Sequence, residues 1–198
     1  RYMNSLQAIG KHEASVKIRN QLGENSGVNL EASQYIEEIK KRLGSYNIEN
    51  IAINSTASDF APSFRLDGLV FSTGRDTSGI SKNIHNWNKK RFLNLYTATK
   101  TEDGGFQNTM RFSDKLNSKL HESSTAFTKD GNTVYFTRNK EKGSGFGRDE
   151  KGISRLKLYK AVFENGKWRN VKELPFNKEG FSVAHPSLNK AEDKLYFA

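Results

Sequence analysis

The sequence contains no cysteine, and it is poor in several other residues that mark particular classes of protein. Without cysteine, disulfide bonds and thiolate metal sites are excluded within these residues, a composition that suits a reducing cytosol or a periplasm. Only 3 prolines and 4 histidines occur among the 198 residues. No apolar run approaches the roughly 18 residues of a membrane-spanning helix, so we expect no transmembrane segment in this chain.

Acidic residues are also scarce relative to basic ones. The chain has 32 Lys and Arg against 22 Asp and Glu, a formal net charge of +10. Such a balance favours acidic partners: nucleic acid, anionic lipid or lipopolysaccharide, or the carboxylates of a cell-wall polymer or a protein loop. A nucleic-acid-binding protein would carry a recognisable motif, or basic residues alternating with stacking aromatics. Because we find no such motif, we expect no nucleic-acid partner.

One stretch of the chain recurs at a fixed spacing. Ser123–Thr137 alternates apolar and polar residues around Asp130-Gly131, a dipeptide that favours a tight turn between antiparallel strands. A similar phrase begins at Asp59 and another at Val183, about 60 residues to either side. A fixed period indicates a repeat architecture.

Between these phrases a second pair of segments matches. Leu93–Ala98 resembles Leu156–Ala161, and each is followed by a glycine turn and an aromatic residue. Each period therefore predicts about four short strands, the content of one blade of a β-propeller. A β-sandwich is the alternative, but it does not require equal spacing of matched phrases.

The predicted fold is therefore mainly β. We predict a partial propeller of about two and a half blades over residues 47–198, with blades at about 58–120, 121–180 and 181–198, the last incomplete. Because propellers typically have about 4–8 blades, we expect the chain to be a piece of a longer protein.

Residues 1–46 have a helical pattern instead. Leu30 to Leu43 predicts a helix that ends before Gly44. Ahead of it, Tyr2, Leu6 and Ile9 share one helical face, and after a break at Gly10 a second stripe follows at Ala14, Ile18 and Leu22. Two helices around a glycine turn are typical of a tetratricopeptide-like hairpin. We predict that residues 1–46 form the end of such a region.

The sequence shows no constellation for catalysis. His12, His85, His121 and His185 are not at metal-ligand spacing, and no Gly-x-Ser-x-Gly motif marks a nucleophilic serine. Gly143 to Gly147 is glycine-rich but lacks the Lys-Ser/Thr of a phosphate-binding loop. We therefore expect no catalytic residue, no metal, no cofactor and no enzymatic activity.

Both predicted blades carry an insertion after the second strand, at residues 73–91 and 138–155. In propeller topology these insertions open on the same face as residues 115–122 and 174–182. Functional residues often lie on loops held by a rigid scaffold, although solvated loops without a function are the alternative. The candidate partner-binding residues are Arg75, Trp87, Lys89, Lys90, Arg91, Phe146 and Arg148.

Several phrases, taken in order, resemble a known family. They include Phe71-Ser72-Thr73-Gly74-Arg75-Asp76, Phe127-Thr128-Lys129-Asp130-Gly131 and Ser182-Val183-Ala184-His185-Pro186. This series resembles the WD40-like (PD40) propeller of OmpA-family proteins of the PorE type, from gliding and type IX-secreting bacteria. The resemblance covers the chain from about Ile48 to Ala198, and the helical start is similar to the last tetratricopeptide repeat that precedes the propeller there.

The resemblance implies a periplasmic protein associated with the outer membrane. It implies a scaffold for secretion or gliding machinery that works beside outer-membrane barrels of the PorP/SprF type or another component of that machinery. Peptidoglycan would be held by a C-terminal OmpA domain that is not in this chain. Two alternatives stay open: a cationic binder of peptidoglycan or lipopolysaccharide, and an accessory propeller of a hydrolase.

Overall fold

The computed structural model describes residues 49–75, 84, 89–143 and 145–198, together with six positions nearer the N-terminus. The chain divides into two compact units, Arg1–Glu49 and Asn50–Ala198. In the first unit the described positions are helical: Glu13, Ala14, Lys17, Ile18, Ile39 and Lys41. The rest of the predicted tetratricopeptide-like region, residues 1–46, lies outside the described residues.

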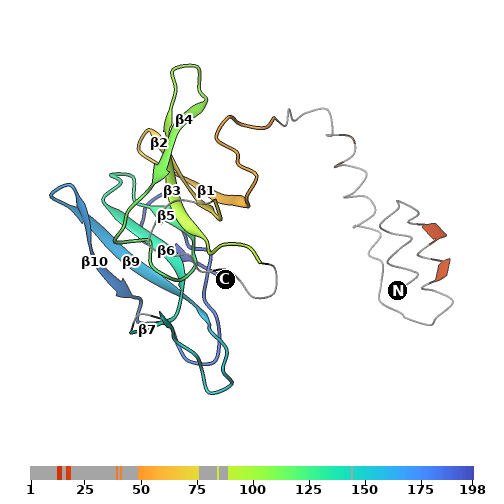
Figure 1. Ribbon diagram of the computed structural model, residues 1–198, viewed down its shortest axis with the longest axis vertical. Coiled ribbons are helices and arrows are strands. Elements are labelled where there is room, and N and C mark those ends of the chain that lie inside the picture. The colour runs from red at the N-terminus through yellow and green to blue at the C-terminus, as the bar shows by residue number, and fades with distance from the viewer. Residues whose placement is uncertain are drawn as a thin grey trace. The chain divides into compact units, whose positions relative to one another are not determined.

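The second unit is mainly β, and its first sheet comes from the first predicted period. Strands β1 (Asp59–Arg65), β2 (Gly68–Thr73), β3 (Asn94–Lys100) and β4 (Phe106–Arg111) form a four-stranded antiparallel sheet in that order (Figure 1). Each strand therefore pairs with its neighbour in sequence. The predicted four strands of this period are confirmed.

The second period builds a sheet of the same kind. Its strands are β5 (Glu122–Phe127), β6 (Thr133–Asn139), β9 (Leu156–Glu164) and β10 (Lys167–Glu173), again antiparallel and in chain order. A small hairpin of β7 (Glu141–Lys142) and β8 (Gly145–Phe146) stands between β6 and β9. In the third period, β11 (Ser187–Leu188) pairs with β12 (Leu195–Tyr196).

The first strand of each period contains an irregularity at the same place. The register shifts between Phe60 and Ser63 in β1 and between Ser123 and Thr125 in β5. The first residue inside each shift has a left-handed backbone, with φ of 51° at Ala61 and 36° at Ser124, and in β1 Pro62 follows inside the same shift. Non-glycine residues rarely adopt this conformation outside bulges and turns.

The third period repeats this backbone geometry. Ala184 and Ala198 exchange two backbone hydrogen bonds, of 2.8 and 2.9 Å, as the last regular pair before the irregularity. The next residue, His185, has φ of 57°. The three periods therefore share this local backbone geometry although the residues at this point differ. The repeat that is seen in the sequence is also a repeat of the structure.

The hairpin turns agree with the sequence in the second period and differ in the others. Gly131 has φ of 67°, as the Asp-Gly turn predicts. In the first hairpin Leu66 takes the left-handed conformation, with φ of 51°, and Gly68 already belongs to β2. In the third, Glu192 has φ of 62° and its N–H donates to Asn189, as the N–H of Gly131 donates to Thr128.

Successive sheets are joined through their first strands, since β1 packs beside β5 and β5 beside β11. The Oγ of Ser72 donates to the carbonyl of Glu122 at 2.8 Å, and Arg65 Nε donates to the carbonyl of Gly131 at 2.9 Å. The guanidinium of Arg65 also lies 4.6 Å from the ring centre of Phe163. Polar bonds and stacking therefore fix how one sheet lies against the next.

The main core lies between the two four-stranded sheets. It comprises Val70, Leu95, Leu116, Val134, Phe136, Tyr159, Ala161 and Trp168, with Phe112, Phe127, Phe163 and Val171 packed against it. A second cluster covers the opposite face of the first sheet and comprises Ile53, Leu69, Phe71, Tyr96 and Ala98. Among the aromatic residues of the repeated phrases, Phe71, Phe127 and Phe136 therefore hold the sheets together, whereas Phe64 and Tyr196 are exposed.

Phe136→Ala should lower the free energy of unfolding by about 3–5 kcal/mol, because its ring is fully buried in the main core. Phe64→Ala is the matched control, since Phe64 is 68% exposed and its removal should change stability by less than about 0.5 kcal/mol. Denaturant unfolding of both variants measures the difference. Equal losses in the two variants would contradict the placement of the core.

Candidate functional site: a cavity at one end of the sheets

The connections between strands converge at one end of the two sheets. In an antiparallel sheet whose strands follow chain order, the start of the first strand and the link from the second to the third strand lie at the same end. Phe92, just before β3, stacks on His121 with ring centres 4.2 Å apart and meets the edge of Phe146 at 5.4 Å. His121 and Phe146, whose ring centres are 6.5 Å apart, therefore bring together residues 115–122 and 138–155, as expected, and Phe92 lies directly after residues 73–91.

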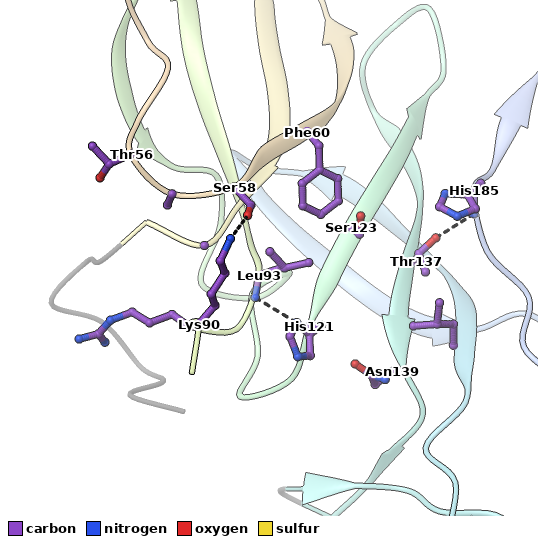
Figure 2. Close-up of a pocket in the computed structure, with 14 residues that line it drawn as sticks. Thr56, Ser58, Phe60, Lys90, Leu93, His121, Ser123, Thr137, Asn139 and His185 are labelled. Carbon is purple, nitrogen blue, oxygen red and sulfur yellow. Dashed lines mark hydrogen bonds between the residues drawn. The ribbon is translucent and has the colours of Figure 1, made fainter. Parts of the chain in front are cut away.

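A cavity of about 670 Å³ opens where these connections meet (Figure 2). Phe60 projects from β1 on one side, and Thr137, Asn139 and His185 stand on another. Among the described residues, its lining consists of Thr56, Ala57, Ser58, Phe60, Gly74, Lys90, Arg91, Leu93, His121, Ser123, Thr137, Asn139, Leu156 and His185. Its volume lies within the range of about 300–1,000 Å³ that is typical of ligand sites.

Hydrogen bonds hold the polar side chains of the wall. Lys90 Nζ donates to Ser58 Oγ at 3.3 Å, and the N–H of Leu93 donates to His121 Nδ1 at 3.2 Å. Because Nδ1 of His121 accepts this hydrogen bond, the neutral imidazole ring carries its proton on Nε2. The Nε2 atom of His121 is itself buried, so the ring is held in the wall and this N–H does not open into the cavity.

The opposite wall is held in the same way. The N–H of His185 donates to Thr137 Oγ1 at 3.1 Å, and its Nδ1 lies 2.8 Å from Ser124 Oγ. His185 is thereby tied to both β5 and β6.

The charge of the cavity is positive. Among the described lining residues the charged groups are Lys90 and Arg91, and there is no carboxylate. Glu122 follows His121 in sequence, but its side chain is fully buried and pairs with Arg138, with Glu122 Oε1 and Arg138 Nε 3.0 Å apart. Because successive residues of a strand point to opposite sides, His121 lines the cavity while Glu122 lies in the core.

The buried pair is part of a small network. Ser118 donates to Glu122 from its backbone N–H at 3.1 Å and from its hydroxyl at 2.5 Å. Arg138 donates to the carbonyl of Leu116 at 2.7 Å, and its guanidinium lies 5.1 Å from the ring centre of Phe136. The network ties the start of β5 to the end of β6 and to the connection that precedes them.

The first sheet contains a corresponding network. Arg75 pairs with Asp59 at 2.9 Å and donates to the carbonyl of Ile53 at 2.8 Å. Ser55 donates to Asp59 from its N–H and its hydroxyl, both at 2.7 Å. The guanidinium of Arg75 lies 5.1 Å from the ring centre of Phe71. Arg75 therefore does in the first sheet what Arg138 does in the second.

The two carboxyl groups have pKa values shifted in opposite directions. Burial raises the pKa of Glu122 to about 7, in spite of the nearby charge of Arg138 and the hydrogen bonds from Ser118. At Asp59 burial also acts to raise the pKa, but the hydrogen bonds from Thr73, Ser55 and Arg75 outweigh it and lower the pKa to about 2. Equivalent positions therefore titrate differently because one is more deeply buried.

The basic segment expected to bind a partner lies at the cavity. Lys89 and Lys90 are exposed, while Arg91 is half-buried and forms an isolated bridge with Ile84. Lys90 and Arg91 line the cavity. Of the candidate residues, these three are the ones that the structure brings together.

The remaining candidates are separated from this segment or fixed by other contacts. Arg75 is committed to Asp59, and Phe146 packs against Phe92. Arg148 is exposed and donates to the carbonyl of Gly152 at 2.7 Å. Trp87 lies outside the described residues.

The sequence analysis did not select four residues that line the cavity: Phe60, His121, Ser123 and His185. A signal for two of them was present in the repeat. Phe60 pairs with Ser72 and Ser123 pairs with Thr137, so Phe60 and Ser123 occupy the same position of successive periods. The first period has the aromatic Phe60 at this position and the second has the small polar Ser123. This difference indicates that the position has a different role in each period.

Ser124 and His185 are the described residues most similar to a catalytic pair. A serine nucleophile requires a base that is itself oriented by a third group. Ser124 is buried, and His185 has no hydrogen bond to a carboxylate within the described part of the chain. The contact joins the bulges of two successive periods, which gives it a structural role.

Two further searches of the described residues gave negative results. No group of three or more His, Asp or Glu side chains there is arranged to hold a metal ion. No helix there has the length and apolar character needed to cross a membrane.

Comparison with known proteins identified no relative. No protein-family model, no curated protein and no solved structure matches the chain.

Stability should fall as the pH rises from about 4.5 to about 7, through the contribution of Glu122. Its pKa is higher in the folded chain than the ordinary value of 4.5, so the folded state binds the proton more tightly. The contribution is complete below pH 4.5 and is lost as the pH passes about 7. Urea unfolding between pH 5 and 7 should show that the free energy of unfolding depends less on pH in Glu122→Gln than in the unmodified protein. An identical pH dependence in both proteins would contradict the raised pKa of Glu122.

Arg75→Met should lower the free energy of unfolding by about 1–3 kcal/mol, because it leaves the carboxylate of Asp59 without its charged partner. The control Arg148→Met removes an exposed guanidinium and should cost less than about 0.5 kcal/mol. Thermal unfolding compares the two. A stable Arg75→Met protein would return Arg75 to the list of binding candidates.

Proposed function

We propose that the chain is a non-catalytic binding scaffold that contains part of a WD40-like β-propeller. The observation that carries this proposal is the repetition of one structural unit. Two successive antiparallel sheets of four strands each have a register shift early in the first strand and a carboxylate–arginine pair at the start of that strand, and their first strands lie together. Radial repetition of four-stranded sheets is the architecture of propellers.

The proposed setting is the periplasm, in association with the outer membrane. The support comes from the ordered sequence phrases that resemble the PD40 propeller of PorE-type OmpA-family proteins. In this proposal the scaffold serves type IX secretion or gliding machinery by docking an outer-membrane barrel of the PorP/SprF type or another component. Attachment to peptidoglycan would use a domain outside this chain, and the helical segment would belong to a tetratricopeptide region.

The proposed docking surface is the end of the sheets at which the cavity opens. Lys89, Lys90 and Arg91 provide its positive charge, and the sheets behind them provide a rigid support. Loops on a rigid scaffold lose little conformational entropy when they bind, which favours affinity.

A second candidate function is the binding of peptidoglycan or lipopolysaccharide. The exposure of Lys89 and Lys90 at the same end favours it, because anionic polymers bind through such charges. Ionic strength separates the two functions. Binding dominated by exposed charges weakens steeply with salt, whereas a protein interface with an apolar centre does not.

The decisive experiment isolates the parent protein from gently solubilised envelopes and identifies, by mass spectrometry, what stays bound through a high-salt wash. A stoichiometric outer-membrane barrel or secretion component supports the scaffold function. Recovery of the protein alone, or with salt-labile wall or lipid fragments, contradicts it and favours the second candidate.

Lys89→Glu combined with Lys90→Glu should reduce the recovered partner while leaving the melting temperature nearly unchanged, because both side chains are exposed. The matched control is Lys167→Glu combined with Lys190→Glu, which changes the net charge equally at two exposed positions, the first residue of β10 and the turn between β11 and β12. Equal recovery with both double variants would remove the basic segment from the interface.

A further inference from the structure

Two equivalent positions of successive periods lie on the cavity wall and carry side chains of different size. Phe60 in β1 and Ser123 in β5 both precede the bulge and both line the cavity. The ring of Phe60 is 40% exposed and overhangs the space, while Ser123 leaves room below it (Figure 2). A second phenylalanine at position 123 would occupy that room.

The lining combines apolar surface with groups that attract an anion. Phe60, Leu93 and Leu156 give apolar walls, and Lys90 and Arg91 give positive charge. The nearest acidic side chains in sequence, Asp59 and Glu122, are engaged by Arg75 and Arg138. Neither of these two carboxylates is among the described residues that line the cavity.

The distribution of these groups favours a carboxylate on an apolar body. Within the described lining the cations come from one short segment, whereas the apolar side chains come from β1, from β9 and from the connection before β3. Phosphate groups usually require several convergent cations or backbone N–H groups. A ligand with one carboxylate and a neighbouring apolar group could place the carboxylate against Lys90 and Arg91 and the apolar group against the apolar lining residues.

From this geometry we propose that the cavity binds an acidic side chain of an extended partner segment, in which the acidic residue stands next to an aromatic or aliphatic one. This inference rests on the proposed docking function and names the chemistry of the docked segment. The carboxylate lies against Lys90 and Arg91, and the neighbouring apolar side chain packs against Phe60 and Leu156.

The test uses two probe peptides and the 198-residue chain. N-acetyl-Phe-Asp-Phe amide and N-acetyl-Phe-Asn-Phe amide differ only in the carboxylate, and inorganic phosphate tests the alternative anion. Titrations followed by the NMR signals of His121 and His185 report binding at the cavity itself. We expect the Asp peptide to bind about tenfold more tightly than the Asn peptide, from one charge-assisted contact.

Two variants locate the site. Ser123→Phe places in β5 the residue that β1 already carries, so it fills the cavity without a change of charge and should abolish binding of the Asp peptide. Lys90→Gln should weaken the Asp peptide about tenfold and leave the Asn peptide unchanged, with Lys190→Gln as the control for net charge. If Ser123→Phe does not fold, Lys90→Gln and its control still decide the question.

Three results would overturn the proposal: equal affinity for the two peptides, unchanged binding in Lys90→Gln, or tighter binding of phosphate than of the Asp peptide. A different result would show that the proposed docking function is wrong. In that case the envelope isolation recovers no protein partner, whatever the peptides do. Peptide binding without a captured partner would keep the cavity as an anion site and reject the docking function.

Discussion

Each of the two four-stranded sheets depends on a charged pair that closes its first hairpin. Asp59 with Arg75, and Glu122 with Arg138, tie the beginning of the first strand to the end of the second. A carboxylate buried alone would be costly, and so would a guanidinium, so each group makes the other tolerable in the interior. The serine four residues before each carboxylate, Ser55 or Ser118, adds donors from the incoming connection. The pair thus determines where the chain enters each sheet and where it leaves the second strand.

The ion pairs lie at the boundary between the strands, which are held by the core, and the connections, which differ in length between the two sheets. The arginines lie over aromatic rings of the core, so the ion pairs and the hydrophobic packing support one another. The connections beyond these pairs are less constrained, and the second carries the small hairpin of β7 and β8. The cavity forms at this boundary, with a rigid floor of strands and a wall of connecting residues. Its chemistry is therefore set by a few side chains and not by the course of the backbone.

Much of the β structure could be predicted from the sequence, because the repeated phrases report both the strands and their spacing. Leu93–Ala98 and Leu156–Ala161 became β3 and β9 almost as their pattern indicates. The ion pairs were not predicted, although Ser55 and Asp59 stand at the same spacing as Ser118 and Glu122. Arg75 was taken for a binding residue because no pattern in sequence shows that a side chain turns inward. The cavity depends on the size of Ser123 relative to Phe60 and on the distance between sheets, and neither follows from periodicity.

The left-handed residue in the first strand of each period has a consequence for how such a repeat can change. Ala61, Ser124 and His185 share this backbone although their side chains have little in common. None is glycine, so each carries a conformational cost that the surrounding structure must offset. Different side chains can therefore occupy the same backbone position in successive periods. The hydroxyl of Ser124 contacts the imidazole of His185, whereas Ala61 has only a methyl group at the corresponding position. A chain built in this way can acquire new chemistry at its junctions by single substitutions, without rebuilding the frame.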